Sequence, residues 1–137
     1  MTCKIVGEED PTASGQYQPG TLYIDCDHTM SDPRVTGTAH YELSATGVEL
    51  DAVNGRSNFW AGTSTLEAEG GTWTGSSYGS EFVSDPIKPM TLYTTGTDLY
   101  RGQGSFAGLS YRVLFARETP LLPGVPYVVS GWIEPLP

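Results

Sequence analysis

Apolar and polar residues alternate along most of this chain, with the two-residue period of a half-buried β-strand. In residues 21–28 the Leu, Ile and Cys side chains fall on one face, and Tyr and two Asp fall on the other. In residues 35–43, Tyr41 shares its face with Val35 and Leu43. Further strand segments are expected at residues 57–66, 72–75, 90–97, 110–115 and 127–134. The pattern predicts an all-β chain with no helix longer than two turns.

Turn signals separate these segments. Residues 31–33 (Ser-Asp-Pro), 54–55 (Asn-Gly) and 70–71 (Gly-Gly) favour tight turns. Residues 119–126 contain three prolines and are predicted as a loop, because proline cannot donate to a strand ladder. Glycines within or beside several strands favour the bends of a closing barrel over a sandwich. We therefore expect one domain over residues 1–137, a single antiparallel up-and-down β-barrel of about eight strands.

Composition and charge narrow the class of function. The chain has 137 residues, of which 38 % are hydrophobic and 17 % are charged, enough for one core. Three Trp and eight Tyr argue against disorder. The net charge of −9 argues against a nucleic-acid partner and against anionic membrane surfaces, since both need basic residues. No apolar run reaches the roughly 18 residues of a membrane span, so none is expected.

The two cysteines, Cys3 and Cys26, have neither CxxC spacing nor a nearby pair of histidines, which argues against a zinc site. We expect them to form a disulfide. Two cysteines, few lysines and abundant Thr, Ser and Gly are typical of an exported protein, so we expect secretion after removal of a signal peptide.

The polar candidates point to no metal and no nucleophile. His28 continues the apolar face of its strand and His40 opposes that of its own, which argues against a metal site shared by the two. Both histidines are expected at the surface or the rim. Of the arginines, Arg34 is expected to pair with Asp32, Arg112 to point outward and Arg101, in a turn, to lie at the rim. Four glutamates that could be paired as in a glycosidase are expected on outward faces instead: Glu42, Glu49, Glu67 and Glu69. Asp10 and Asp98 are expected in turn-like contexts, without the repeated acidic spacing of a calcium-binding loop.

The aromatic residues are more informative. Several occur on separate predicted strands and would face one lumen in a closed barrel, where they could make an apolar pocket for a ring or polyene. They could equally fill the barrel with side chains, and both interpretations stay open. The expected ligand-binding wall consists of Tyr41, Trp60, Trp73, Tyr111 and Phe115.

Four segments carry a resemblance to a known family. Residues 26–38 (CDHTMSDPRVTGT) resemble a motif of exported bacterial proteins. Residues 60–63 (WAGT), 70–75 (GGTWTG) and 102–109 (GQGSFAGL) resemble shorter glycine-containing elements of the same proteins. Together they are similar to the allene oxide cyclase and dirigent barrels, which include barrels that act as Diels–Alderases.

The resemblance implies an eight-stranded, lipocalin-like barrel that steers the ring closure or coupling of an apolar substrate without metal or cofactor, in a small oligomer. Allene oxide cyclases use a Glu and an Asn on the first strand, where this chain has Asp25 and Asp27, so no catalytic residue is carried over. The resemblance also implies that Tyr111, Val113 and Phe115 point inward, in agreement with the alternation of apolar and polar residues in their strand.

Three functions follow as hypotheses: a barrel that binds a small apolar molecule, a cofactor-independent cyclase or isomerase that acts by orienting its substrate, and an exported structural barrel with a filled lumen. A buried ionisable group with a perturbed pKa among the lumen aromatics would favour the enzyme over the binding protein. Association into a homodimer or homotrimer is expected through the Thr- and Tyr-rich outer strands.

Overall fold

The computed structural model describes residues 1–9, 20–49, 56–84, 91–120 and 126–137. Within these ranges the chain forms eight β-strands and one 3-10 helix, η1 (Pro33–Val35), between the second and third strands. The strands are β1 (Thr2–Glu9), β2 (Gly20–His28), β3 (Gly37–Glu49), β4 (Arg56–Ala68), β5 (Gly71–Ser84), β6 (Thr91–Gly104), β7 (Leu109–Pro120) and β8 (Val128–Pro135). The all-β prediction is confirmed.

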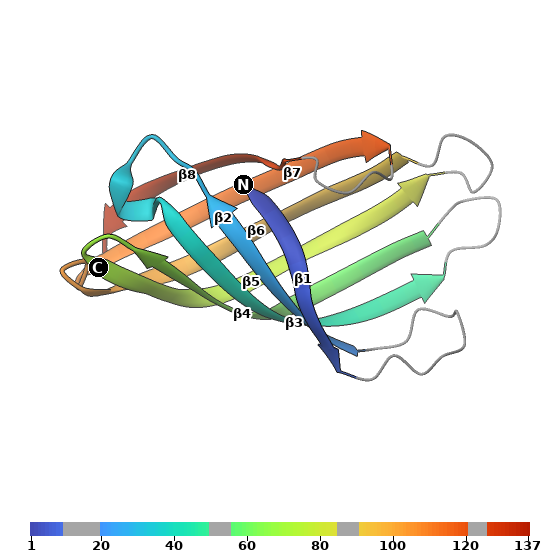
Figure 1. The fold of residues 1–137 in the computed structure, drawn as a ribbon, viewed down its shortest axis with the longest axis horizontal. Helices are drawn as coiled ribbons and strands as arrows, with labels where there is room; N and C mark the ends of the chain where they lie inside the picture. Colours follow the sequence, from blue (N-terminus) through green and yellow to red (C-terminus); the bar gives the residue numbers. More distant parts are fainter. Residues whose placement is uncertain (10–19, 50–55, 85–90, 121–125) are drawn as a thin grey trace.

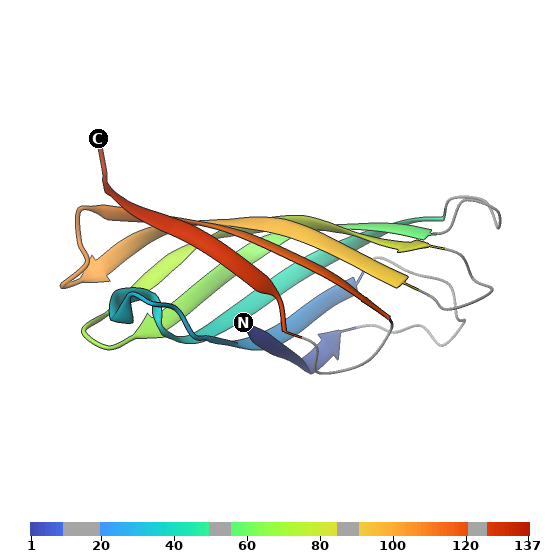
Figure 2. The same ribbon diagram turned by 90° about the horizontal axis from the view of Figure 1, so that it is seen from above.

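All eight strands belong to one antiparallel sheet, and each pairs with its neighbours in sequence, from β1 to β8. The sheet is strongly curled, and its strands wrap around a concave face (Figures 1 and 2). Right-handed strand twist and long strands of up to 14 residues give such a sheet its curvature. The result is a half-barrel with the expected up-and-down order.

The two outermost strands meet at one point. Tyr127, just before β8, donates a backbone hydrogen bond of 2.8 Å to the carbonyl of Met1. The amino group of Met1 donates back to the carbonyl of Tyr127 at 3.4 Å. In the described part of the chain, no ladder between β1 and β8 continues from this pair. A single residue pair therefore joins the two edges of the sheet.

The hydrophobic core lies on the concave face and is densest near η1. Val35 of η1 is buried, and the indole nitrogen of Trp73 donates to the carbonyl of Arg34 at 2.7 Å. Phe106, in the turn between β6 and β7, stacks on Trp73 with ring centroids 5.0 Å apart. These contacts close the η1 end of the half-barrel. Asp32 holds the start of η1 by accepting a hydrogen bond from the Arg34 amide, and it also pairs with the Arg34 guanidinium as expected.

Several strand boundaries differ from those expected. The sequence pattern missed β1, and the predicted loop at 119–126 begins too early, because residues 119 and 120 still pair with β6. Proline is tolerated there because the register between β7 and β8 ends at Ala116, which makes this end of β7 an edge. The expected Asn-Gly hairpin at 54–55 lies outside the described residues. Among those that are described, no helix has the length and apolar character needed to cross a membrane.

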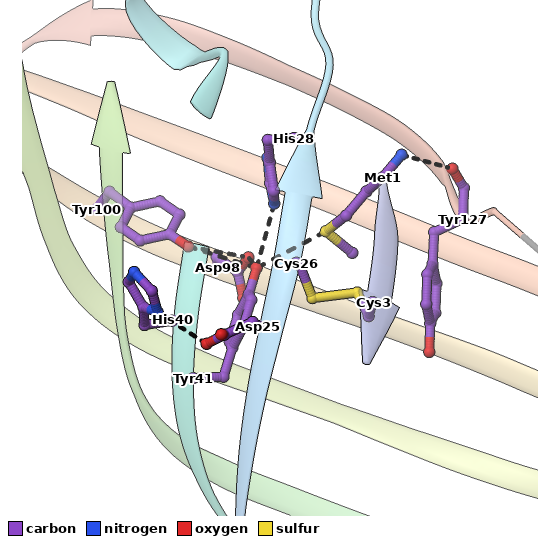
Figure 3. Close-up of a disulfide and its surroundings, with 10 residues drawn as sticks. All are labelled: Met1, Cys3, Asp25, Cys26, His28, His40, Tyr41, Asp98, Tyr100 and Tyr127. Atoms are coloured by element: carbon purple, nitrogen blue, oxygen red, sulfur yellow. Dashed lines mark hydrogen bonds and ion pairs between the residues drawn. A yellow bond between two sulfur atoms is a disulfide. The ribbon is translucent and has the colours of Figure 1, made fainter. Parts of the chain in front are cut away.

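The expected disulfide is confirmed. Cys3 and Cys26 are direct partners in the register of β1 and β2, and their sulfur atoms are bonded across the two strands. Cys26 is buried in the core. The bond fixes β1 to the rest of the sheet near the point where Met1 meets Tyr127 (Figure 3).

Candidate ligand-binding and acid–base site

Strand register arranges the side chains of the concave face in rows across the sheet. Ser77 of β5 lies opposite Asp98 of β6, which lies opposite Val113 of β7. The next row toward η1 contains Tyr41, Ser64, Gly75, Tyr100 and Tyr111, on β3 to β7. Residues of five strands thus converge on the middle of the concave face.

A buried carboxylate lies at the centre of this region. Asp98 is 0 % exposed. Tyr41 Oη donates to Asp98 Oδ2 at 2.9 Å, and Tyr100 Oη donates to the same oxygen at 3.4 Å. His28 Nε2 lies 3.3 Å from Tyr41 Oη (Figure 3). We call His28, Tyr41, Asp98 and Tyr100 the acid cluster.

Burial shifts the pKa of every member of the acid cluster toward its neutral form. It raises the pKa of Asp98 to about 6, against the opposing effect of the Ser77, Tyr41 and Tyr100 hydroxyls. It lowers the pKa of His28 to about 4, with a smaller contribution from the Met1 amino group. The pKa values of Tyr41 and Tyr100 are raised, first by burial and then by nearby charge and phenol groups. Asp98 is therefore the member that can exchange a proton near neutral pH.

Several buried polar atoms around the acid cluster have no hydrogen-bond partner among the described residues. They include Asp98 Oδ1, His28 Nδ1 and the hydroxyl of Tyr111. The Ser77 hydroxyl lies beside Asp98 and lowers its pKa, although it makes no aligned hydrogen bond. Unpaired buried polar groups cost stability, so they are uncommon in a core that serves packing alone. A polar atom of a bound ligand could supply the missing hydrogen bond to one of these atoms.

An aromatic surface lies one row from Asp98, on the side away from η1. Its row contains Trp60, Gly79, Gly96 and Phe115, on β4 to β7. A Cβ atom at Gly79 would overlap the Trp60 indole, and one at Gly96 would overlap the Phe115 ring. Glycine at these two positions lets both rings lie close against the backbone. The rings are nearly parallel, at 16° and 6.5 Å between centroids, and we call them the aromatic floor.

All five residues of the predicted ligand-binding wall lie on the concave side of the sheet. Tyr41, Trp73, Tyr111 and Phe115 are buried, and Trp60 packs against the core while partly exposed. Trp73 stacks with Phe106 at the closed η1 end. Trp60 and Phe115 form the aromatic floor, and the two tyrosines lie in the row next to Asp98.

The structure corrects two predictions for buried residues. His28 is 2 % exposed rather than at the surface or rim, because its strand places it on the apolar face. Asp98 lies inside β6 and not in a turn.

Other candidates lie on the convex face. Arg101 is exposed within β6 and is not at a rim of the concave face. Arg112 is exposed as expected and pairs with Glu134 at 3.2 Å. Asp25 pairs with the exposed His40 at 2.8 Å, and Asp27 is exposed. The two aspartates therefore take no part in the acid cluster.

Sequence reasoning placed Asp98 in a turn, and it missed three other residues of the concave face: Tyr100, Glu81 and Arg117. The alternation of β6 could not identify Asp98 and Tyr100, because the opposite face of the strand carries the apolar Leu99. For Arg117, the period that places Tyr111 and Phe115 inward also places position 117 inward, and this was the available signal.

Comparison with protein-family models, with curated proteins and with solved structures found no match. Within the described residues, no three His, Cys, Asp or Glu side chains gather as a metal site would require. The chemistry that the geometry supports comes from its own side chains: a carboxylate that can take up a proton, tyrosine hydroxyls that can donate hydrogen bonds, and aromatic rings that can hold a flat ligand.

Proposed function

We propose that the concave face binds an apolar small molecule and that the acid cluster makes the protein a cofactor-independent isomerase or cyclase. The aromatic floor supports binding, since Trp60 is partly exposed and its indole can stack on a planar ligand while Phe115 supports it from the buried side. The resemblance to allene oxide cyclase and dirigent barrels supports the same class of reaction.

One observation carries the choice of an enzyme over a simple binding protein: the fully buried Asp98, whose pKa of about 6 lies near neutral pH. A binding site for an apolar molecule has no need of a buried carboxylate, and burying one without a cationic partner is costly. Enzymes place such groups where a proton must be taken up and returned.

The reaction that suits these groups is a proton transfer next to a carbonyl. Asp98 Oδ1 would take a proton from the carbon beside the carbonyl, and the electrons of that C–H bond would form an enolate. The Tyr111 hydroxyl, which has no partner among the described residues, would donate a hydrogen bond to the enolate oxygen. The proton on Asp98 would then return to another carbon, which moves the double bond or accompanies ring closure.

Binding is tested by tryptophan fluorescence with a panel of planar ketones and polyenes. Trp60→Ala should weaken binding, because it removes half of the aromatic floor. Trp132→Ala is the matched control, since Trp132 is exposed on the convex side. No response from any ligand would reject the proposal and leave the structural barrel with a filled lumen.

Catalysis is tested by the absorbance change when a β,γ-unsaturated ketone becomes conjugated. Asp98→Asn should abolish turnover, and Tyr111→Phe should lower it by about 10- to 100-fold with little change in stability. Tyr78→Phe is the matched control, because Tyr78 is an exposed tyrosine of β5. Equal turnover in wild type and Asp98→Asn would show that the protein binds ligands without acting on them.

We further propose that the protein is exported and associates as a homodimer or homotrimer. The Cys3–Cys26 disulfide supports an oxidising compartment. Four large side chains on the convex side of β5 to β8 are between 45 % and 49 % exposed and support association: Tyr78, Leu99, Leu114 and Trp132. Light scattering at micromolar concentration tests the mass, and Leu114→Lys should yield monomers. A monomer mass for the wild type would reject the association.

A further inference from the structure

His28 is a buried titratable residue that the proposed reaction does not use. It is the last residue of β2, it is 2 % exposed, and its ring points toward Tyr41 (Figure 3). Its Nε2 atom lies 3.3 Å from Tyr41 Oη, while its Nδ1 atom has no hydrogen-bond partner among the described residues. A buried imidazole with one nitrogen unpaired costs stability, so its place in the acid cluster calls for an explanation.

His28, Tyr41 and Asp98 form a continuous chain of hydrogen bonds. Tyr41 Oη lies between the other two residues, 2.9 Å from Asp98 Oδ2 and 3.3 Å from His28 Nε2. The sulfur atom of Met1 also lies 3.9 Å from this hydroxyl, but a thioether accepts hydrogen bonds only weakly. The Tyr41 hydroxyl has a single proton, so its direction depends on which of its two stronger neighbours accepts that proton.

The ionised form of Asp98 fixes one arrangement of the chain. A carboxylate is the strongest acceptor in the acid cluster, so Tyr41 donates to Asp98 Oδ2. The oxygen of Tyr41 is then left to accept a hydrogen bond from His28. This requires that the neutral imidazole carries its proton on Nε2, which leaves Nδ1 bare.

The protonated form of Asp98 allows every hydrogen bond of the chain to reverse. The carboxyl group then donates from Oδ2 to Tyr41 Oη, and Tyr41 donates to His28 Nε2, which must be bare, so the ring carries its proton on Nδ1. The two arrangements differ by one proton. As Nδ1 gains that proton, Nε2 gives its own proton to Tyr41, and Tyr41 gives its own to Asp98.

We propose that Tyr41 and His28 form a proton relay that serves Asp98, in which each proton that reaches or leaves Asp98 Oδ2 enters or leaves the chain at His28 Nδ1. The imidazole is neutral before and after the transfer and changes only its tautomer. This inference goes beyond the proposed function, because it describes the protein without a ligand.

The two carboxylate oxygens of Asp98 have separate surroundings, which suits such a relay. Oδ2 accepts hydrogen bonds from Tyr41 and Tyr100, whereas Oδ1 has no partner among the described residues. Asp98 itself is 0 % exposed, while His28 ends its strand directly before the exposed Thr29. The relay therefore lets Asp98 exchange its proton at Oδ2 while Oδ1 stays available to a ligand.

The titratable groups around the relay keep their charge in the pH range where Asp98 changes its own. Burial raises the pKa values of the Tyr100 and Tyr111 phenols, which face Asp98 from β6 and β7. The Met1 amino group, just before β1, adds to the effect of burial on His28, whose pKa is lowered to about 4. Near pH 6 the imidazole is therefore neutral while Asp98 titrates, so a change of tautomer there follows Asp98.

Nitrogen NMR of the isotope-labelled protein without ligand tests the relay, because a protonated ring nitrogen and a bare one give well separated signals. His28 should carry its proton on Nε2 at about pH 8 and on Nδ1 at about pH 5. The midpoint of this change should coincide with that of the Asp98 carboxyl carbon signal. His40 is the internal reference, since it lies on the convex face and pairs with Asp25, so variants of the acid cluster should leave its signals unchanged.

Two variants and one control assign the change to the relay. Tyr41→Phe removes the middle of the chain, so the tautomer of His28 should no longer follow Asp98, although the carboxyl signal still titrates. Asp98→Asn removes the titrating group, so His28 should hold one tautomer at both pH values. Tyr100→Phe is the matched control, because it also removes a hydroxyl beside Asp98 Oδ2 but leaves the chain to His28 in place. The tautomer change should remain in this variant.

Four results would overturn the relay. A single tautomer of His28 throughout the titration of Asp98 would show that the proton of Asp98 does not enter the chain. A doubly protonated ring near pH 6 would make His28 itself the titrating group. A tautomer change that persists in Tyr41→Phe would exclude the path through Tyr41. A carboxyl signal of Asp98 that does not titrate would leave the relay without a proton to carry. The first three results leave the proposed ligand binding and its fluorescence test untouched, and the fourth also rejects Asp98 as the proton acceptor.

Discussion

Asp98→Asn isolates the energetic cost of the buried carboxylate. Folding raises the pKa of Asp98 from its ordinary 3.8 to about 6. Between these two values the folded protein retains a proton that the unfolded chain has lost, so stability falls as the pH rises. The cost is absent below pH 3.8 and fully present above pH 6. At about 1.4 kcal/mol per pKa unit, the ionised carboxylate costs about 3 kcal/mol at neutral pH.

Asparagine has nearly the same shape and can still accept hydrogen bonds from Tyr41 and Tyr100, but it carries no charge. We therefore expect Asp98→Asn to be more stable than the wild type by up to about 3 kcal/mol at about pH 7 and nearly equal to it at about pH 4. Urea unfolding followed by tryptophan fluorescence measures the free energy of unfolding at each pH. The difference between the variant and the wild type is the quantity to compare, because His28, whose pKa folding lowers to about 4, also changes its charge in this pH range.

Asp27→Asn is the control, since Asp27 is an exposed carboxylate of the convex face and its replacement should change stability little at either pH. If Asp98→Asn were less stable than the wild type at neutral pH, the tyrosine hydroxyls would stabilise the charged carboxylate more than burial penalises it. Asp98 would then be a structural anchor, and its assignment as a proton acceptor would be refuted.

Three further predictions test the structure around the site. Replacing Cys3 and Cys26 by Ser should lower the free energy of unfolding by about 3 kcal/mol, and thiol titration of the unfolded, unreduced wild type should find no free thiol. Gly96→Val should displace the Phe115 ring, cost about 1–3 kcal/mol in urea unfolding and remove the fluorescence response to planar ligands; an unchanged response would contradict the aromatic floor. Because folding lowers the pKa of His28 to about 4, stability should be lost as the pH falls from 6.5 toward 4, and His28→Gln should reduce this loss; identical pH profiles would contradict it.

The sequence was most informative where a strand has one apolar and one polar face. In residues 35–43 and 110–115 the alternation placed Tyr41, Tyr111 and Phe115 on the buried side, and the structure agrees. The cysteine pairing could also be predicted, because two cysteines and no metal spacing leave few alternatives. These features depend on residues that are close in sequence or on simple elimination.

The acid cluster could not be predicted, because it depends on strand register. Tyr41 of β3 and Asp98 of β6 are 57 residues apart, and they meet only when four strands pair in one alignment. The face of β6 was also ambiguous, since Leu99 points outward while Tyr100 points inward. Long strands built largely from glycine, serine and threonine, such as β5, carry too few large side chains to mark which face is buried.

The order of the strands has a consequence for how the chain folds. Each of the described strands pairs only with strands that precede or follow it directly, so each backbone ladder closes a single hairpin loop. Folding speed falls as contacts span more of the chain, and a sheet made of successive hairpins avoids the long-range pairings that slow most all-β proteins. The chain can add its strands one after another as it emerges from synthesis, and the contact of Met1 with Tyr127 is the step that must wait for the last strand.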